Sequence, residues 1–121
     1  MTEELPVLYS VEGAVARITL NRPDKRNALN DAVVSGLKDR LRDASMDDRV
    51  SVVVITGAGK DFCSGADLSA LQKIAQATVD ENAEDAHSLL ELFLLIRQIH
   101  VPVVAAVKGR ALAGGCGLAS A

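Results

Sequence analysis

Two valine-rich segments, each followed by closely spaced glycines, constrain the fold of this chain more than any other feature. Residues 50–56 lead into a first glycine corner at residues 57–65, and residues 102–107 lead into a second at residues 109–117. Apolar runs of this length and β-branched content are typical of buried strands. Glycine allows a sharp backbone turn and leaves its N–H groups unscreened by side chains. If the two strands are neighbours, the corners can aim two N–H groups at one point, where a developing oxyanion would be stabilised.

The remaining pattern predicts a hairpin followed by alternating helices and strands. Glu12 and Gly13 form the expected hairpin turn. The order of the elements predicts an α/β domain with a mainly parallel sheet and crossover helices. We expect strands at residues 7–9 and 14–20, a helix from Asp31 capped by Asn30, a strand at residues 50–56, a short helix at about residues 68–77, a longer helix from about residue 80 to Ile99, and a strand from Pro102.

Composition excludes several classes of function. The formal charge of −3 and the isoelectric point near 5.3 give no general attraction to nucleic acid or to an anionic membrane. One tyrosine and two phenylalanines are too few for a base-stacking platform. No apolar run approaches the roughly 20 residues that span a bilayer, and the N-terminus lacks the order of a signal peptide. We therefore expect no nucleic-acid or membrane partner and a cytoplasmic location.

The two cysteines favour packing over chemistry. Cys63 and Cys116 lie far apart, with no CxxC motif and no Cys/His cluster. This pattern indicates neither a metal site nor a disulfide framework. We expect both side chains to act as small buried hydrophobes in a reducing compartment.

The last residues affect the expected domain organisation. Residues 114–121 read as a glycine turn that opens an apolar helix, with no C-cap and no following element. We expect residues 1–121 to be the N-terminal part of one larger domain. The alternative is a small self-contained domain with a frayed end.

Several polar residues have two interpretations each. Arg22, Lys25 and Arg26 form either a solvated surface or a phosphate contact ahead of a helix start. Lys60 follows two glycines, but the spacing is not that of a phosphate-binding loop, which favours a solvated loop lysine. Asp67 either caps a helix that begins at residue 68 or holds the first glycine corner through backbone hydrogen bonds.

Three motifs extend almost end to end over the chain: NRPDKRNALN at residues 21–30, FCSGADL at residues 62–68, and HVPVVAAV at residues 100–107 followed by AGGCG at residues 113–117. In this order and at this spacing they resemble the enoyl-CoA hydratase/isomerase (crotonase) superfamily. The resemblance implies the α/β crotonase-like (ClpP/crotonase) ββα spiral fold, incomplete in this chain. Family members are about twice as long, so the chain is similar to their N-terminal half.

The resemblance also implies a catalytic role for the glycine corners. In this family a coenzyme A thioester binds with its carbonyl between two backbone N–H groups, which by motif position belong to Ala66 and Gly114. Negative charge builds on that oxygen as an enolate, and losing one donor costs on the order of 3 kcal/mol in comparable sites. A helix opening at Gly114 would add its N-terminal partial charge.

Binding roles follow from the same motif positions. Lys25 and Arg26 match the basic stretch that approaches the coenzyme A phosphates, and Ala28 matches the position near the adenine and pantetheine. Ser64, Asp67 and Leu68 match positions along the substrate channel. The resemblance implies no metal and no cofactor, because coenzyme A is part of the substrate. Family members commonly form trimers and hexamers, which predicts a homo-oligomer.

The chain departs from the family at Gly117. Classical hydratases carry there one of two glutamates that transfer protons, and glycine has no side chain to do so. The second would fall about twenty residues further on, beyond Ala121. We expect an enoyl-CoA hydratase that adds water to a 2-enoyl-CoA, in which a single glutamate could do the acid–base work. The alternatives are enoyl-CoA isomerisation, dehalogenation or thioester hydrolysis on the same enolate platform, or a non-catalytic coenzyme A-binding or assembly protein.

Overall fold

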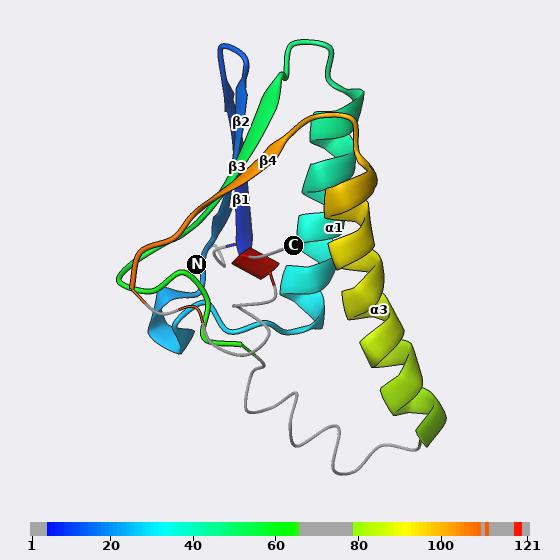
Figure 1. The fold of residues 1–121 in the computed structure, drawn as a ribbon. Coiled ribbons are helices and arrows are strands. Elements are labelled where there is room, and N and C mark those ends of the chain that lie inside the picture. Colours follow the sequence, from blue (N-terminus) through cyan, green and yellow to red (C-terminus); the bar gives the residue numbers. More distant parts are fainter. Residues whose placement is uncertain (1–4, 66–78, 110, 112–117, 120–121) are drawn as a thin grey trace.

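A four-stranded sheet forms one layer of the computed structural model, which describes residues 5–65, 79–109, 111 and 118–119. Its strands are β1 (Val7–Glu12), β2 (Val15–Leu20), β3 (Val52–Gly57) and β4 (Val103–Ala106), in the spatial order β1-β2-β3-β4 (Figure 1). β1 pairs antiparallel with β2, whereas β2–β3 and β3–β4 are parallel. The predicted mainly parallel sheet is confirmed for these strands.

The β1–β2 hairpin turns one residue later than the sequence pattern predicts. Glu12 is still in the ladder, opposite Val15, so the two turn residues are Gly13 and Ala14. Gly13 has a φ of +58°, a left-handed conformation that glycine adopts without a Cβ penalty. The correction is small, but it places six residues in each strand.

Two long helices follow the expected boundaries closely. α1 spans Asp31–Met46 and α3 spans Val79–Gln98, while the short helix predicted at residues 68–77 lies outside the described residues. The Asn30 side chain caps α1 as predicted, because its Oδ1 accepts a hydrogen bond from the Val33 N–H at 2.9 Å. A 3-10 turn, η1 (Pro23–Lys25), lies between β2 and α1.

Asp47 ends α1 and fixes the chain beyond it. Its carboxylate accepts hydrogen bonds from the Arg49 guanidinium at 2.7 and 3.0 Å and from the Arg49 main-chain N–H at 2.9 Å. These bonds lower the pKa of Asp47 from 3.8 to about 2, because they favour the charged form. The chain therefore leaves the helix in a defined direction toward β3.

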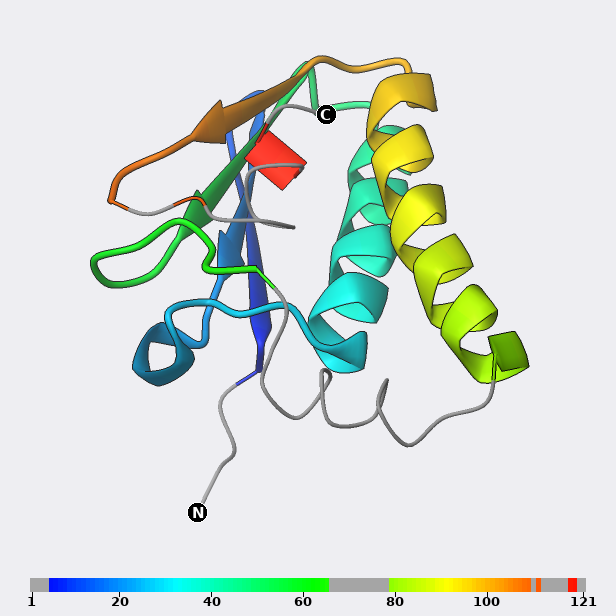
Figure 2. The ribbon, with the colours of Figure 1, turned by 60° about the horizontal axis from the view of Figure 1, so that its bottom comes forward.

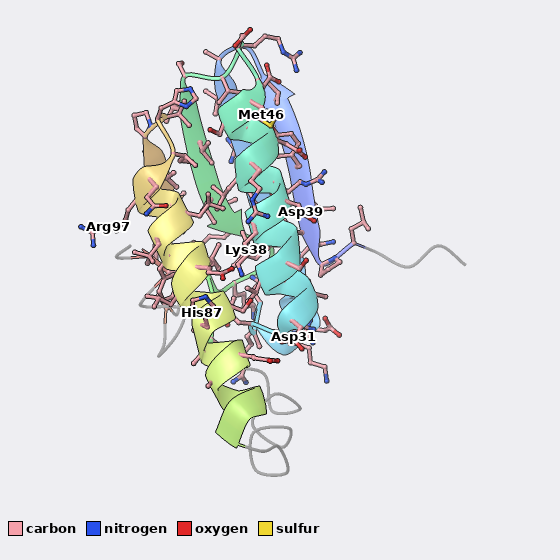
Figure 3. All side chains as sticks on the ribbon, turned by 90° about the vertical axis from the view of Figure 1, so that its right-hand side faces the viewer. Asp31, Lys38, Asp39, Met46, His87 and Arg97 are labelled. Atoms are coloured by element: carbon pink, nitrogen blue, oxygen red, sulfur yellow. The ribbon has the colours of Figure 1, made fainter. Side chains whose placement is uncertain are left out.

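Both helices lie on the same face of the sheet, where the core forms (Figures 1 and 3). Alternate residues of β2 and β3 point to this face, as a half-buried sheet requires. The strand residues in the core are Val7, Ala16, Ile18, Leu20, Val53 and Ile55, and the helix residues are Val33, Leu37, Leu41, Ala44, Leu92 and Ile96. Both helices therefore turn an apolar face to the sheet. On β4 the opposite face is open, with Val104 half exposed.

Lys38 joins the two helices in a way that the periodicity did not indicate. Its side chain is only 10% exposed, and its Nζ donates to Ser88 Oγ at 2.8 Å and to Glu91 Oε2 at 3.3 Å. Figure 3 shows Lys38 on α1 beside α3, which carries His87. His87 Nε2 lies 2.8 Å from Glu91 Oε1, and the ring is largely exposed. A buried cation with two partners thus fixes how α3 packs on α1.

Loss of the α1 cap provides a first test of this fold. Asn30→Ala should lower the free energy of unfolding by about 1 kcal/mol, because the Val33 N–H loses its acceptor. Asn30→Asp is the matched control, since a carboxylate oxygen accepts the same bond. Urea unfolding of the protein at its natural length measures both. Equal stability of the alanine and aspartate variants would show that the cap contributes nothing.

Candidate functional site

The loops that follow β2, β3 and β4 gather at one edge of the sheet. Because the three strands are parallel, their carboxyl ends meet there, with η1 next to the loop after β3 (Figures 1 and 2). Two backbone hydrogen bonds join the first two loops. The Ser64 N–H donates to the Arg26 carbonyl at 3.1 Å, and the Leu29 N–H donates to the Gly65 carbonyl at 2.6 Å. The motif at residues 21–30 therefore lies along the first glycine corner.

The loop after β4 joins the same assembly. Cys63 and Ala111 form a parallel bridge, so the two glycine corners lie side by side at these two residues. Gly109 has a φ of +65°, and a Cβ on it would collide with the Lys60 carbonyl oxygen. Only glycine allows this approach. The expectation that the corners are neighbours is confirmed at these residues.

Asn27 lies at the centre of this assembly, and the sequence reasoning missed it. Its side chain is 1% exposed. Its Oδ1 accepts from the Arg22 N–H at 2.9 Å, and its Nδ2 donates to the carbonyls of Ala58 and Asp61, both at 2.8 Å. Asn27 and Arg26 have φ values of 56° and 53°. Asparagine is among the few residues that adopt this left-handed conformation readily, which is the signal that could have indicated its role.

The predicted basic cluster divides into two parts. The half-buried Arg22 has a structural role, because its Nη1 donates to the Ala28 carbonyl at 2.8 Å. Lys25 and Arg26 are exposed. Ala28, which follows them in the sequence, is buried. Of the predicted channel residues, Ser64 is half-buried beside Arg26. The other predicted site residues lie outside the described residues; they are Ala66, Asp67, Leu68, Gly114 and Gly117.

An open pocket of about 510 Å³ lies at the same edge of the sheet. It is lined by Pro23, Arg26, Gly59, Lys60 and Asp61. Arg26 and Lys60 come from different loops, so the fold brings two cationic side chains to one hollow. Lys60 is exposed, as predicted, but its place beside Arg26 could not be read from the sequence.

Comparison with known proteins identifies the family. The sequence model of the enoyl-CoA hydratase/isomerase family matches residues 10–121. The chain belongs to this family. The resemblance noted from the three motifs is therefore confirmed.

Relatives of the enoyl-CoA hydratase/isomerase family align along nearly the whole chain. "Probable enoyl-CoA hydratase EchA14" of Mycobacterium tuberculosis H37Rv is 44% identical over 124 residues, covering 100% of this chain and 46% of its own length. The 2,3-dehydroadipyl-CoA hydratase of Escherichia coli K12 is 39% identical over 114 residues, covering 93% and 42%. The chain thus spans about half the length of these relatives. That it forms the N-terminal part of a single domain stays a prediction.

Solved structures confirm the fold of the enoyl-CoA hydratase/isomerase family. A Legionella pneumophila protein named as an enoyl CoA hydratase/isomerase (crotonase) superposes with a TM-score of 0.92 at 37% identity, over 96% of this chain and 45% of its own. An enoyl-CoA hydratase/isomerase from Xanthobacter autotrophicus Py2 gives 0.88 at 35% identity, over 93% and 42%. The predicted crotonase-like α/β fold is therefore confirmed.

The described part of the chain holds neither a metal-binding cluster nor a membrane-spanning helix. In the described ranges, no group of three His, Cys, Asp or Glu side chains is arranged to hold a metal ion. No helix among those residues has the length and apolar character needed to cross a membrane.

Cys63 lies in the first glycine corner, and its thiol is not activated as a nucleophile. The side chain is fully buried, and burial raises the pKa of the thiol, more than the hydrogen bond with the Gly65 backbone lowers it. A raised pKa disfavours the nucleophilic thiolate. Cys63 therefore acts as a buried hydrophobe, as expected, while Cys116 lies outside the described residues.

Thiol labelling tests this assignment. In a Cys116→Ser background, Cys63 should react with Ellman's reagent roughly 100-fold more slowly in the native protein than in urea, because burial disfavours the thiolate and blocks access. Fast stoichiometric labelling of the native protein would contradict this.

Proposed function

We propose that the protein carrying this chain binds an acyl-CoA thioester and hydrates a 2-enoyl-CoA. The parallel bridge between Cys63 and Ala111 is the observation that supports this most strongly. Ala66 and Gly114 each come three residues after a member of that bridge. Three residues of chain reach at most roughly 10 Å. Two corners that run in parallel and carry their candidate donors at equal offsets are well placed to present two N–H groups to one oxygen.

The two N–H donors would act when the enolate forms, which is the step of the hydration with the highest energy. Water attacks C3 of the enoyl group, the C2–C3 π electrons move toward the carbonyl, and negative charge develops on the thioester oxygen. The N–H groups of Ala66 and Gly114 stabilise that enolate without reorganising. A proton then reaches C2. Gly117 offers no side chain for either proton transfer, so we propose that a carboxylate elsewhere in the protein performs them.

The pocket beside η1 suits the other end of the substrate. Arg26 and Lys60 are cations from two loops, and charge-assisted hydrogen bonds to phosphate are among the strongest that side chains make. Lys25, next to Arg26, adds positive charge. The Arg26 carbonyl accepts a hydrogen bond from the Ser64 N–H. The segment that would bind the phosphates is therefore directly bonded to the segment that would bind the thioester. We propose that the coenzyme A phosphates bind in this pocket and that its pantetheine arm passes Ala28 toward Ser64, Asp67 and Leu68.

We also propose a homo-oligomeric state, a trimer or hexamer, in the cytoplasm, with no cofactor beyond the coenzyme A of the substrate. Half-exposed apolar side chains at Leu90 on α3 and Val104 on β4 support association. Analytical ultracentrifugation of the protein at its natural length tests it, and a monomer at micromolar concentration would count against it.

Removal of one donor tests the oxyanion site. Ala66→Pro deletes the backbone N–H and should lower kcat for crotonyl-CoA hydration by about 100- to 1000-fold, with a much smaller change in KM. Ala66→Ser keeps the N–H and is the matched control. The loss of the conjugated enoyl absorbance measures the rate. A proline variant with the kcat of the serine variant would remove Ala66 from the site.

Removal of the cations tests the phosphate end. Arg26→Ala and Lys60→Ala should each raise KM for crotonyl-CoA by roughly 10-fold, since each loses a charge-assisted contact. The crotonyl thioester of N-acetylcysteamine lacks the phosphates, so its hydration should not change in either variant. An equal effect on both substrates would contradict the assignment.

A second candidate function follows from Gly117. A protein with the anion-stabilising corners but no proton-transfer group would bind coenzyme A esters without converting them. Calorimetry with crotonyl-CoA and acetoacetyl-CoA separates the cases. Binding with turnover supports the hydratase, binding without turnover supports the non-catalytic protein, and no binding overturns both. Release of free thiol would indicate thioester hydrolysis, and migration of a 3-enoyl double bond would indicate isomerisation.

A further inference from the structure

We infer that Asn27 is a positioning residue: it holds the loop after β3 so that the oxyanion donor at residue 66 is correctly aimed. The inference rests on the proposed function. It assigns a role to a residue that contacts no substrate in our proposal. Its basis is the hydrogen bonding at the edge where the three loops meet.

The carboxamide of Asn27 makes three hydrogen bonds, all of them to main chain. One goes to Arg22, ahead of η1, and two go to Ala58 and Asp61, in the loop after β3. The side chain is 1% exposed, so water cannot readily replace these bonds. Truncation would remove all three bonds at once from a partly buried site, which costs more than the loss of solvated bonds.

The backbone at Asn27 is as constrained as its side chain. Arg26 and Asn27 are consecutive non-glycine residues with positive φ, a conformation that Arg26 keeps only where the surroundings enforce it. Gly57 complements them from β3. A Cβ on Gly57 would lie 2.5 Å from the carbonyl oxygens of Asp61 and Phe62 and 2.7 Å from Asn27 Nδ2. The turn at residues 26–27 and the loop after β3 therefore pack against each other at a fixed distance.

Leu29 links the turn at residues 26–27 to the oxyanion donor. The Leu29 N–H donates to the Gly65 carbonyl at 2.6 Å. A trans peptide unit is planar, with its C=O and N–H pointing in opposite directions. The Gly65 carbonyl and the amide of residue 66 share one such unit, so whatever holds that carbonyl also orients that amide. Asn27 lies two residues before Leu29 and fixes the segment from which the bond is made.

The main test separates the carboxamide from its backbone conformation. Asn27→Gly retains positive φ but removes all three side-chain bonds. In the protein at its natural length it should lower kcat for crotonyl-CoA by roughly 10- to 100-fold, the effect of a displacement of about 1 Å at a reacting group, with a smaller change in KM. The carbonyl ¹³C shift of a bound, carbonyl-labelled acyl-CoA should move toward its value in water, because the carbonyl is less polarised.

A destabilised control distinguishes aiming from stability. Leu41→Ala opens a cavity in the core on α1, away from the three loops. It should lower the unfolding midpoint but leave kcat within about twofold and the ¹³C shift unchanged in the folded protein. If Asn27→Gly does not fold, replacement of Leu29 by its α-hydroxy acid removes only the N–H that binds Gly65 and should reproduce the loss of polarisation.

The two proposals fail in different ways. If the unmodified protein binds no acyl-CoA, the proposed function is overturned. If it binds and polarises the thioester, but folded Asn27→Gly, or the Leu29 ester, retains the same kcat and ¹³C shift, the role of Asn27 is overturned while the function stands. If Leu41→Ala shows the same losses as Asn27→Gly, the effect is one of general stability and the positioning role is again overturned.

Discussion

The parallel pairing of β2, β3 and β4 is the constraint on which the rest of the structure depends. Three carboxyl-terminal loops meet at one edge only because these strands run in the same direction. The bridge between Cys63 and Ala111 continues this pairing beyond the strands themselves. At Cys63 and Ala111 the two glycine corners are therefore neighbours as a direct consequence of sheet topology.

Packing and hydrogen bonding have separate tasks in this fold. Apolar side chains on one face of the sheet and on two helices form the core, and they fix the strands. The loops at the edge place Leu29, Phe62 and Cys63 in that core and are further held by main-chain and carboxamide hydrogen bonds. Hydrogen bonds are directional, so they can define where an N–H points, whereas apolar burial depends mainly on area. The candidate site lies at the edge of the sheet, where these directional hydrogen bonds are added to the packing of the core.

Local signals in the sequence were sufficient for most elements but not for the site. The sequence pattern predicted both long helices, and Asn30 was correctly identified as the cap of α1. Asn27 was missed because its role depends on carbonyls more than thirty positions away, in a loop whose path the sequence does not reveal. The contacts of Lys38 and the place of Lys60 beside Arg26 likewise depend on residues that are distant in the sequence. The donors at Ala66 and Gly114 rest on motif resemblance and on the bridge, and they stay a prediction.

The span of the contacts at this edge affects how the protein folds. The Asn27 bonds join positions 31 and 34 residues apart, and the Cys63–Ala111 bridge joins segments further apart still. Contacts of high sequence separation form late, because a long loop must close before they stabilise anything. During synthesis the hairpin and α1 have their local partners early, whereas the second corner can join only after β4 has left the ribosome. The parallel strand pairs β2–β3 and β3–β4 close loops of similar length, so we expect the binding edge to assemble together with the parallel part of the sheet.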